Sequence, residues 1–281
     1  MTRAAAVALL GLALIAPSSA LAWCQLTTSQ DDPEGRACVE TGRPLVWMRR
    51  CMRYSIDMQG SGDLPIEDVR RIVATSFESW TNTLCDGTQI ALEVEEGPLA
   101  DCRRPQHRRS GANVNVIAFL EEWPGRFDDT AFAITSVWHS RRTGEIWDAD
   151  IVVNEEHFPW TECPSRGACP EGPDGLPLVD LQNVMTHEIG HFFGMAHSEF
   201  VATTMDARSP RGEIFKRILR TDDVEGICTI YPPASAPAEC DFTPRGGEEL
   251  FCSESAGCSA AGDAESPWLF LLAVVFLRRR R

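Results

Sequence analysis

The sequence has too few basic residues to suit a nucleic acid partner. It carries 26 Lys and Arg against 41 Asp and Glu, a formal net charge of −15 at pH 7. Binding to nucleic acid needs a basic surface that neutralises phosphates, so we expect no such partner. No two cysteines have the Cys-x-x-Cys spacing, which argues against a thiolate zinc cluster. No internal repeat is present either.

The N-terminus has the residue pattern of a secretory signal peptide. Arg3 is followed by an apolar run over residues 4–16 and by small residues that end at Ala22. This order predicts cleavage after Ala22 and export of the protein. A lipoprotein signal at Cys24 is the alternative, and it is disfavoured because the bulky Trp23 precedes the cysteine.

The C-terminus carries a second short apolar segment, residues 268–277, followed by four arginines. It is about half the length of a membrane-spanning helix, which needs about 20 apolar residues. With the Gly257-Cys258 pair, the segment resembles the MYXO-CTERM sorting tails of myxobacterial surface proteins. That resemblance implies processing near Cys258 and anchoring at the cell surface, with an outer-membrane association. A permanent short membrane anchor is the alternative.

Eleven cysteines in an exported chain predict disulfides, because the compartments outside the cytoplasm are oxidising. If Cys258 belongs to the sorting signal, ten cysteines remain for five bridges. Sequence does not fix the pairing. Proximity along the chain suggests three pairs: Cys163 with Cys169, Cys85 with Cys102, and Cys240 with Cys252.

Hydrophobic periodicity predicts an α+β domain between the two ends. Alternating apolar residues indicate five strands, within residues 45–58, 88–96, 113–120, 131–139 and 145–154. We expect a twisted five-stranded mixed sheet with packed helices. The predicted divisions are a signal peptide (1–22), an N-terminal segment (23–44), the domain (45–232), a Pro/Ala/Cys-containing linker (233–256) and the sorting tail (257–281).

Two helices are predicted in this domain. The first begins after Asp63, which can cap it, with Pro65 in its first turn. Its apolar face is expected to be buried and comprises Val69, Ile72, Val73, Phe77 and Trp80. The second covers residues 178–193, where an apolar stripe is interrupted by Glu188.

The second helix contains the motif HEIGHFFGMAHS, residues 187–198. Residues four apart lie on one face of a helix, so His187 and His191 can bind one ion together. Gly194 allows the chain to leave the helix sharply, and His197 can return as a third ligand. Three protein ligands and one open position are typical of a hydrolytic Zn²⁺ site.

Glu188 is interpreted as a general base beside this site. It could accept a proton from water that the metal activates and pass it to the leaving amine. Two other interpretations of the motif are weighed against this one. The histidines could be structural side chains of the core, or the zinc could be purely structural. Five fixed identities at these offsets arise by chance with odds on the order of 10⁻⁵, which disfavours both.

The motif resembles that of the metzincin metalloproteases, H-E-x-x-H-x-x-G-x-x-H followed by a methionine turn. Met205 lies at the interval found in the matrixin branch, and Ser198 is the matrixin choice after the third histidine. Residues 219–232 resemble the closing matrixin helix, and residues 144–154 the edge strand that lines the substrate cleft. In all, the resemblance covers about residues 45–232.

The resemblance implies a metzincin-like catalytic domain with a zinc-binding active-site helix. It implies His187, His191 and His197 as ligands of one catalytic Zn²⁺, Glu188 as the general acid/base and Met205 as the apolar floor beneath the metal. For Met205 alone, an ordinary core methionine is the alternative.

Three departures from the family pattern concern the surroundings of this site. Asp206 and Ala207 stand where matrixins usually carry tyrosine and proline, which puts the specificity pocket in doubt. Cys38 lacks a cysteine-switch context, so we expect a disulfide there. The family's structural zinc and calcium sites have no clear match, and structural Ca²⁺ is unsupported. The only candidates, for which surface or core roles are favoured, are His139, His157, Asp148 and Asp150.

These observations predict a secreted or surface-anchored zinc endopeptidase that hydrolyses peptide bonds in protein or peptide substrates. A catalytically silent metzincin-fold module for zinc binding or adhesion at the cell surface is the alternative, and intact Glu188 argues against it. An astacin-like metzincin would share the chemistry and differ in the fold details.

Overall fold

The structure is a computed structural model, and it describes residues 23–29, 38–39, 41–233, 239–252 and 270–275. The predicted signal peptide and Cys258 lie outside the described residues. Among the described residues, no helix combines the length and the apolar character needed to cross a membrane.

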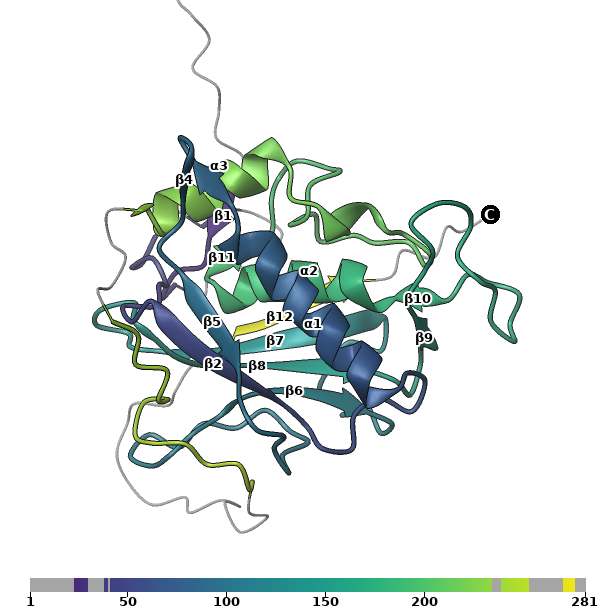
Figure 1. Cartoon of the computed structure of the whole chain (residues 1–281), viewed down its shortest axis with the longest axis horizontal. Helices are drawn as coiled ribbons and strands as arrows, with labels where there is room; N and C mark the ends of the chain where they lie inside the picture. Colours follow the sequence, from purple (N-terminus) through teal and green to yellow (C-terminus); the bar gives the residue numbers. More distant parts are fainter. Residues whose placement is uncertain (1–22, 30–37, 40, 234–238, 253–269, 276–281) are drawn as a thin grey trace, which may run out of the picture.

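A mixed β-sheet forms the centre of the fold (Figure 1). All five predicted strand regions contribute to it, in the order β7-β8-β6-β2-β5, and a further strand, β12, pairs with β7. β5, β2, β6 and β8 run parallel, and β7 is antiparallel to β8. The bounds are β2 Cys51–Ile56, β5 Glu93–Glu96, β6 Asn115–Leu120, β7 Ala131–His139, β8 Ile146–Asn154 and β12 Phe270–Val275.

Two helices lie against one face of this sheet, and α3 closes the domain beside them (Figure 1). The helices are α1 Ile66–Thr81, α2 Leu181–Phe192 and α3 Thr221–Ile230, with the short 3₁₀ helix η1 Phe215–Arg217 before α3. The remaining short strands are β1 Cys24–Gln25, β3 Leu84–Cys85, β4 Thr88–Gln89, β9 Trp160–Thr161, β10 Val179–Asp180 and β11 Met195–Ala196. The α+β fold class predicted from the sequence, a mixed sheet with packed helices, is therefore confirmed.

Helix α1 buries the face that periodicity predicted, including Val69 and Trp80. Glu67 and Asp68 lie in its first turn, where the helix dipole favours negative charge. The predicted cap at Asp63 is wrong. Pro65 holds the N-cap position, and the Asp63 carboxylate instead accepts a hydrogen bond from the Trp160 backbone N–H at 2.8 Å.

Three other boundaries differ from the sequence prediction. Region 88–96 is divided between β4 and β5, because its first part forms a hairpin with β3. Helix α2 begins at Leu181 rather than at 178, because Val179–Asp180 pair with β9. Region 145–154 was expected to be an edge strand, but β8 lies between β6 and β7, and all but one of its residues are buried.

Five disulfides connect the described cysteines, as the count predicted. Cys163 pairs with Cys169 as expected, and Cys38 pairs with Cys24. The other two suggested pairs are wrong. The observed partners join segments distant in sequence: Cys51–Cys240, Cys85–Cys228 and Cys102–Cys252.

Two of these bridges hold residues 239–252, a part of the predicted linker, against the domain. Cys240 is bonded to the first residue of β2, and Cys252 to Cys102. Isolated β-bridges pair Asn113 with Glu248 and Asp101 with Phe251. The described part of this region therefore lies on the domain.

Candidate metal centre

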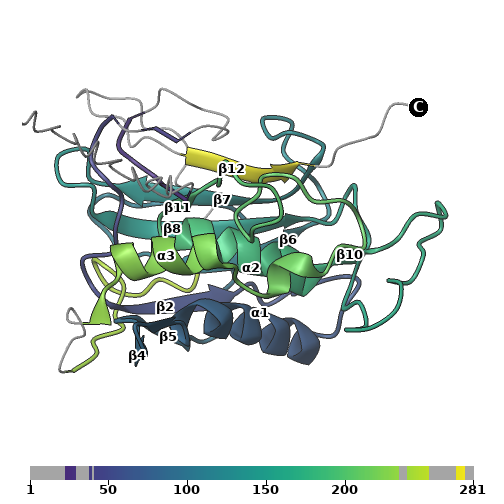
Figure 2. The ribbon, with the colours of Figure 1, turned by 90° about the horizontal axis from the view of Figure 1, so that it is seen from above.

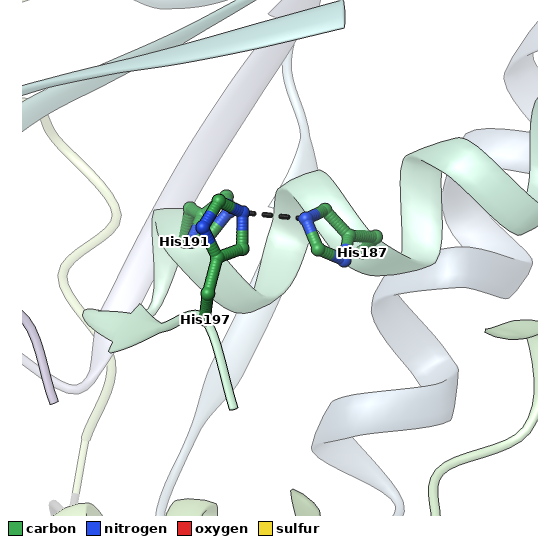
Figure 3. Close-up of side chains that lie close together, drawn as sticks. All are labelled: His187, His191 and His197. Carbon is green, nitrogen blue, oxygen red and sulfur yellow. Dashed lines mark hydrogen bonds between the residues drawn. The ribbon is translucent and has the colours of Figure 1, made fainter. Parts of the chain in front are cut away.

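Three histidines converge at the C-terminal half of α2 (Figure 3). The Nε2 atom of His191 lies 3.1 Å from Nε2 of His187 and 3.2 Å from Nε2 of His197. All three side chains are buried, with at most 2% of their surface exposed. The sequence-predicted ligands are therefore brought together, two by the helix and one by the turn that follows it.

Hydrogen bonds at the second ring nitrogen, Nδ1, fix the orientation of the His187 and His191 rings. The Nδ1 atom of His187 lies 2.6 Å from the Thr204 carbonyl oxygen, and Nδ1 of His191 lies 2.9 Å from the Met195 carbonyl oxygen. A carbonyl oxygen only accepts, so each Nδ1 must carry the proton. In each neutral ring the Nε2 lone pair then points into the centre of the cluster.

These residues fit a zinc ion. Two Nε2 lone pairs 3.1 Å apart repel each other unless a cation lies between them. Tetrahedral zinc with Zn–N bonds of about 2.0–2.1 Å separates two ligand nitrogens by about 3.3 Å, close to the observed spacing. Burial lowers the pKa of His187 and of His191 well below 6.5, which keeps both rings in the neutral form that binds metal.

Gly194 makes the return of His197 possible. Its φ is +89°, in the left-handed region, and a Cβ at this position would lie 2.6 Å from the Leu45 carbonyl oxygen. The Gly194 N–H donates to the His191 carbonyl oxygen at 2.9 Å and closes the end of the helix. The role inferred for this glycine from the sequence matches its backbone conformation.

Glu188 lies on the side of α2 that faces the sheet. It is fully buried, and its Oε2 lies 2.6 Å from the hydroxyl of Thr135 on β7. The same hydroxyl lies 3.1 Å from the Glu188 carbonyl oxygen. Thr135 thus connects the motif to the sheet, and its position in a predicted strand gave no local signal of this contact.

Met205 lies against α2 at Gly190, which stands between the two helical histidines. A Cβ on Gly190 would lie 2.2 Å from the Met205 sulfur, so only glycine permits this contact. The Met205 carbonyl oxygen accepts from Ser198 N–H at 2.9 Å, next to the third histidine. Met205 is fully buried. Its place is compatible with the floor implied by the resemblance.

The start of α3 holds the methionine turn through Asp223. Its carboxylate accepts from the backbone N–H groups of Thr204 at 2.8 Å and Met205 at 3.0 Å. It also accepts from Arg220 N–H at the N-cap position of α3, at 2.8 Å. The neighbouring Asp222 accepts from the Ser198 hydroxyl at 2.7 Å. The Asp-Asp pair noted in the sequence therefore supports the site.

The N-terminal end of α2 is fixed by Asp180. Its carboxylate caps the helix by accepting from Asn183 N–H at 2.7 Å, and it also accepts from Cys163 N–H at 2.8 Å. Arg217 of η1 forms an ion pair with the same carboxylate. These contacts hold the helix that carries His187 in one orientation.

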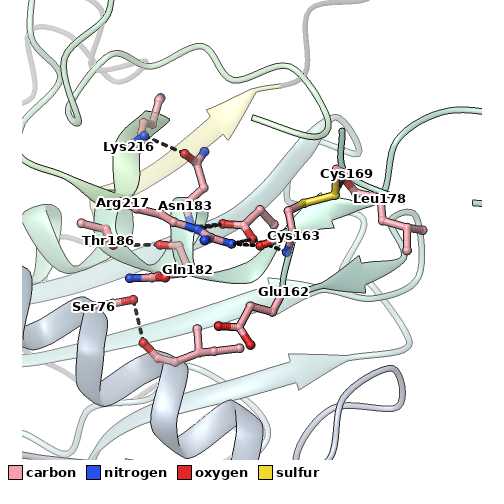
Figure 4. Close-up of polar contacts among 12 residues, drawn as sticks. Ser76, Glu162, Cys163, Cys169, Leu178, Gln182, Asn183, Thr186, Lys216 and Arg217 are labelled. Carbon is pink, nitrogen blue, oxygen red and sulfur yellow. Dashed lines mark hydrogen bonds and ion pairs between the residues drawn. A yellow bond between two sulfur atoms is a disulfide. The ribbon is translucent and has the colours of Figure 1, made fainter. Parts of the chain in front are cut away.

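A buried lysine, Lys216, is a further charge close to the site. Its ammonium donates to the Asp206 carbonyl oxygen, and its backbone N–H donates to the Asn183 side chain at 2.7 Å (Figure 4). The pKa of Lys216 is lowered by burial, and the charges of nearby carboxylates, Glu188 among them, offset only part of this effect. Sequence reasoning missed this residue, because nothing in the local pattern distinguishes it from a surface lysine.

Among the described residues, none of the four residues considered for structural metal sites belongs to a trio of converging metal-ligating side chains. Asp148 contacts His107 at 3.2 Å, and Asp150 accepts from Val116 N–H at 2.8 Å. His139 is buried and His157 is exposed. Within the described part of the chain, the only trio of metal-ligating side chains that meets is the one on α2 and its following turn.

Comparison with known proteins agrees with this geometry. Residues 117–232 match the family described as Matrixin. Metalloendoproteinase 1-MMP of Arabidopsis thaliana is 26% identical over 199 residues, which cover 68% of this chain and 46% of that protein. The chain thus spans about half the length of this curated relative. Together the matches support a matrixin-like metalloprotease.

Proposed function

We propose that this protein is an exported zinc-dependent endopeptidase that cleaves protein or peptide substrates. The observation that carries the proposal is the convergence of three buried Nε2 atoms at the helix that also carries the buried Glu188. The Matrixin match supports zinc peptidase chemistry at the family level. Five disulfides support export, because such bonds persist in oxidising compartments.

In this proposal His187, His191 and His197 hold the zinc ion. When bound, zinc supplies Lewis acidity toward the scissile carbonyl and lowers the pKa of water at its open position. Glu188 accepts a proton as a water oxygen bonds to the carbonyl carbon, and it delivers that proton to the nitrogen of the breaking C–N bond. The products are a carboxyl group and an amine. Thr135 holds Oε2 of Glu188 and orients the carboxylate.

Cleavage of casein by the purified chain tests this function. Glu188→Gln keeps the size and shape of the side chain and removes the base, so we expect a loss of about 10²–10⁴-fold in kcat/KM. Glu199→Gln is the matched control, because Glu199 is exposed just beyond the motif. This variant should retain full activity.

Zinc content separates catalysis from folding in this experiment. We expect about one zinc per chain in the wild type and in Glu188→Gln, and loss of zinc in His191→Ala. Equally poor cleavage by wild type and Glu188→Gln, with zinc bound in both, would reject the enzyme in favour of a silent zinc-binding module.

A further inference from the structure

The outer edge of β7 lies beside the candidate metal centre. β7 pairs with β8 along one edge, and the opposite edge faces away from the rest of the sheet. Helix α2, which carries His187 and Glu188, contacts β7 directly. A strand edge in this place offers a row of backbone N–H and C=O groups to an extended peptide.

Residues 270–275 of the same chain occupy this edge. They form β12, which runs antiparallel to β7 and is the outermost strand of the sheet (Figure 2). β12 also contacts α2. The segment that resembled half a membrane helix thus takes part in the sheet as a strand over these residues.

The register places β12 at the residue that holds Glu188. Leu272 is opposite Thr135, and Thr135 donates toward Glu188 at 2.6 Å. Leu271 and Phe270 follow opposite Ser136 and Val137. An extended peptide that added to β7 at this point would need the same backbone positions, so it and β12 exclude each other.

We propose that residues 270–275 are an autoinhibitory strand, which occupies the outer edge of β7 beside the metal centre in competition with extended peptide substrates. The competition rests on the proposed endopeptidase function, whereas the docking does not. Because residues 253–269 connect β12 to Cys252, which is bonded to Cys102, the segment stays covalently attached near the edge. The processing near Cys258 predicted from the sequence would detach it and open the edge.

The attachment makes even a weak contact effective. A tethered segment acts at an effective concentration on the order of 1 mM. If a separate peptide with the β12 sequence bound the edge of β7 with a Kd of about 0.1 mM, the ratio of effective concentration to Kd would be about ten. The edge would then be covered about tenfold more often than it is open. Removal of the segment should then raise kcat/KM about tenfold, through a lower KM.

Hydrogen exchange tests the docking without any turnover. The full chain carrying Glu188→Gln is compared with the same chain ending at residue 269 and with a Leu272→Pro/Ala273→Pro variant. In an antiparallel pair the N–H groups alternate, so one of two neighbouring prolines must remove a donor to β7. Arg279→Pro/Arg280→Pro is the control, because its prolines lie beyond the strand.

We expect backbone amides within residues 131–139 to exchange at least tenfold more slowly in the full chain and the control than in the truncated chain and the Leu272→Pro/Ala273→Pro variant. Equal exchange in all four chains would overturn the docking. Protection that falls on dilution would also overturn it, since a second copy would then supply the strand.

Cleavage kinetics in chains with intact Glu188 test the competition. The truncated chain and the proline variant should exceed the full chain about tenfold in kcat/KM, and the control should match the full chain. Equal kcat/KM in all active chains would overturn the competition. No cleavage by any chain would overturn it together with the proposed function, while the exchange experiment would still decide the docking.

Discussion

Replacement of Thr135 by valine tests whether the sheet positions Glu188, the proposed general base. Valine keeps the branched shape of this fully buried side chain and removes the hydroxyl that lies 2.6 Å from Glu188 Oε2. A hydrogen bond to a charged group contributes about 1.5–3 kcal/mol. If that contribution is realised in the transition state, kcat should fall about 10–100-fold while KM changes less than about twofold.

Thr135→Ser is the matched control, because it retains the hydroxyl and loses only a methyl group. We expect serine to keep kcat within about threefold of the wild type, and thermal unfolding to show both variants folded. Because the proposed competition by β12 acts on KM, the comparison rests on kcat at saturating substrate. A Thr135→Val enzyme with kcat within twofold of wild type, or a serine variant as slow as the valine variant, would refute positioning by this hydroxyl.

Three further changes test how the site is supported. Gly194→Ala adds a Cβ 2.6 Å from a backbone carbonyl oxygen. We expect it to lower the free energy of unfolding by about 1–3 kcal/mol, measured by denaturant unfolding, and to lose the bound zinc, measured by metal analysis. Gly167→Ala, at φ +99° with nothing within 4 Å, should cost less than this and keep its zinc; equal losses would contradict the steric argument. Asp223→Asn leaves one carbonyl oxygen in place of a carboxylate that accepts from three backbone N–H groups, so calorimetry should show a loss of about 1–3 kcal/mol, and an unchanged Tm would show that these bonds are dispensable. Peptide mapping without reduction should recover Cys85 joined to Cys228, and replacing both by serine should cost about 2–5 kcal/mol; a peptide joining Cys85 to Cys102 would contradict the fold.

The features that sequence predicted well depend on neighbours along the chain. His187 and His191 share a helix face because they are four residues apart, and Gly194 allows the turn because of its own backbone freedom. The buried face of α1 follows from the same helical period. These properties are encoded within about one or two turns of chain, so they can be read without knowledge of the fold.

The sequence failed where the answer depended on long-range pairing. It placed β8 at the edge of the sheet, and it paired Cys85 with Cys102 by proximity along the chain. Three of the five disulfides join cysteines more than a hundred residues apart, and β6 pairs with β8 rather than with β7, which follows it in the sequence. No local pattern carries that information. The C-terminal apolar segment was likewise judged by its length alone, without the edge of β7 that it pairs with.

The sequence by itself determined the kind of site, because the three histidines, Glu188 and Gly194 lie within a short stretch whose geometry a helix and one glycine turn define. Only the tertiary structure decided what surrounds that site. Thr135 of β7 and Lys216 of η1 contact α2, and Asp223 of α3 holds the turn that contains Met205; all three reach the site through the packing of separate elements. The physical reason is that helix geometry fixes the spacing of near neighbours, whereas contacts between elements are set by sheet register and burial, which emerge only when the whole chain folds.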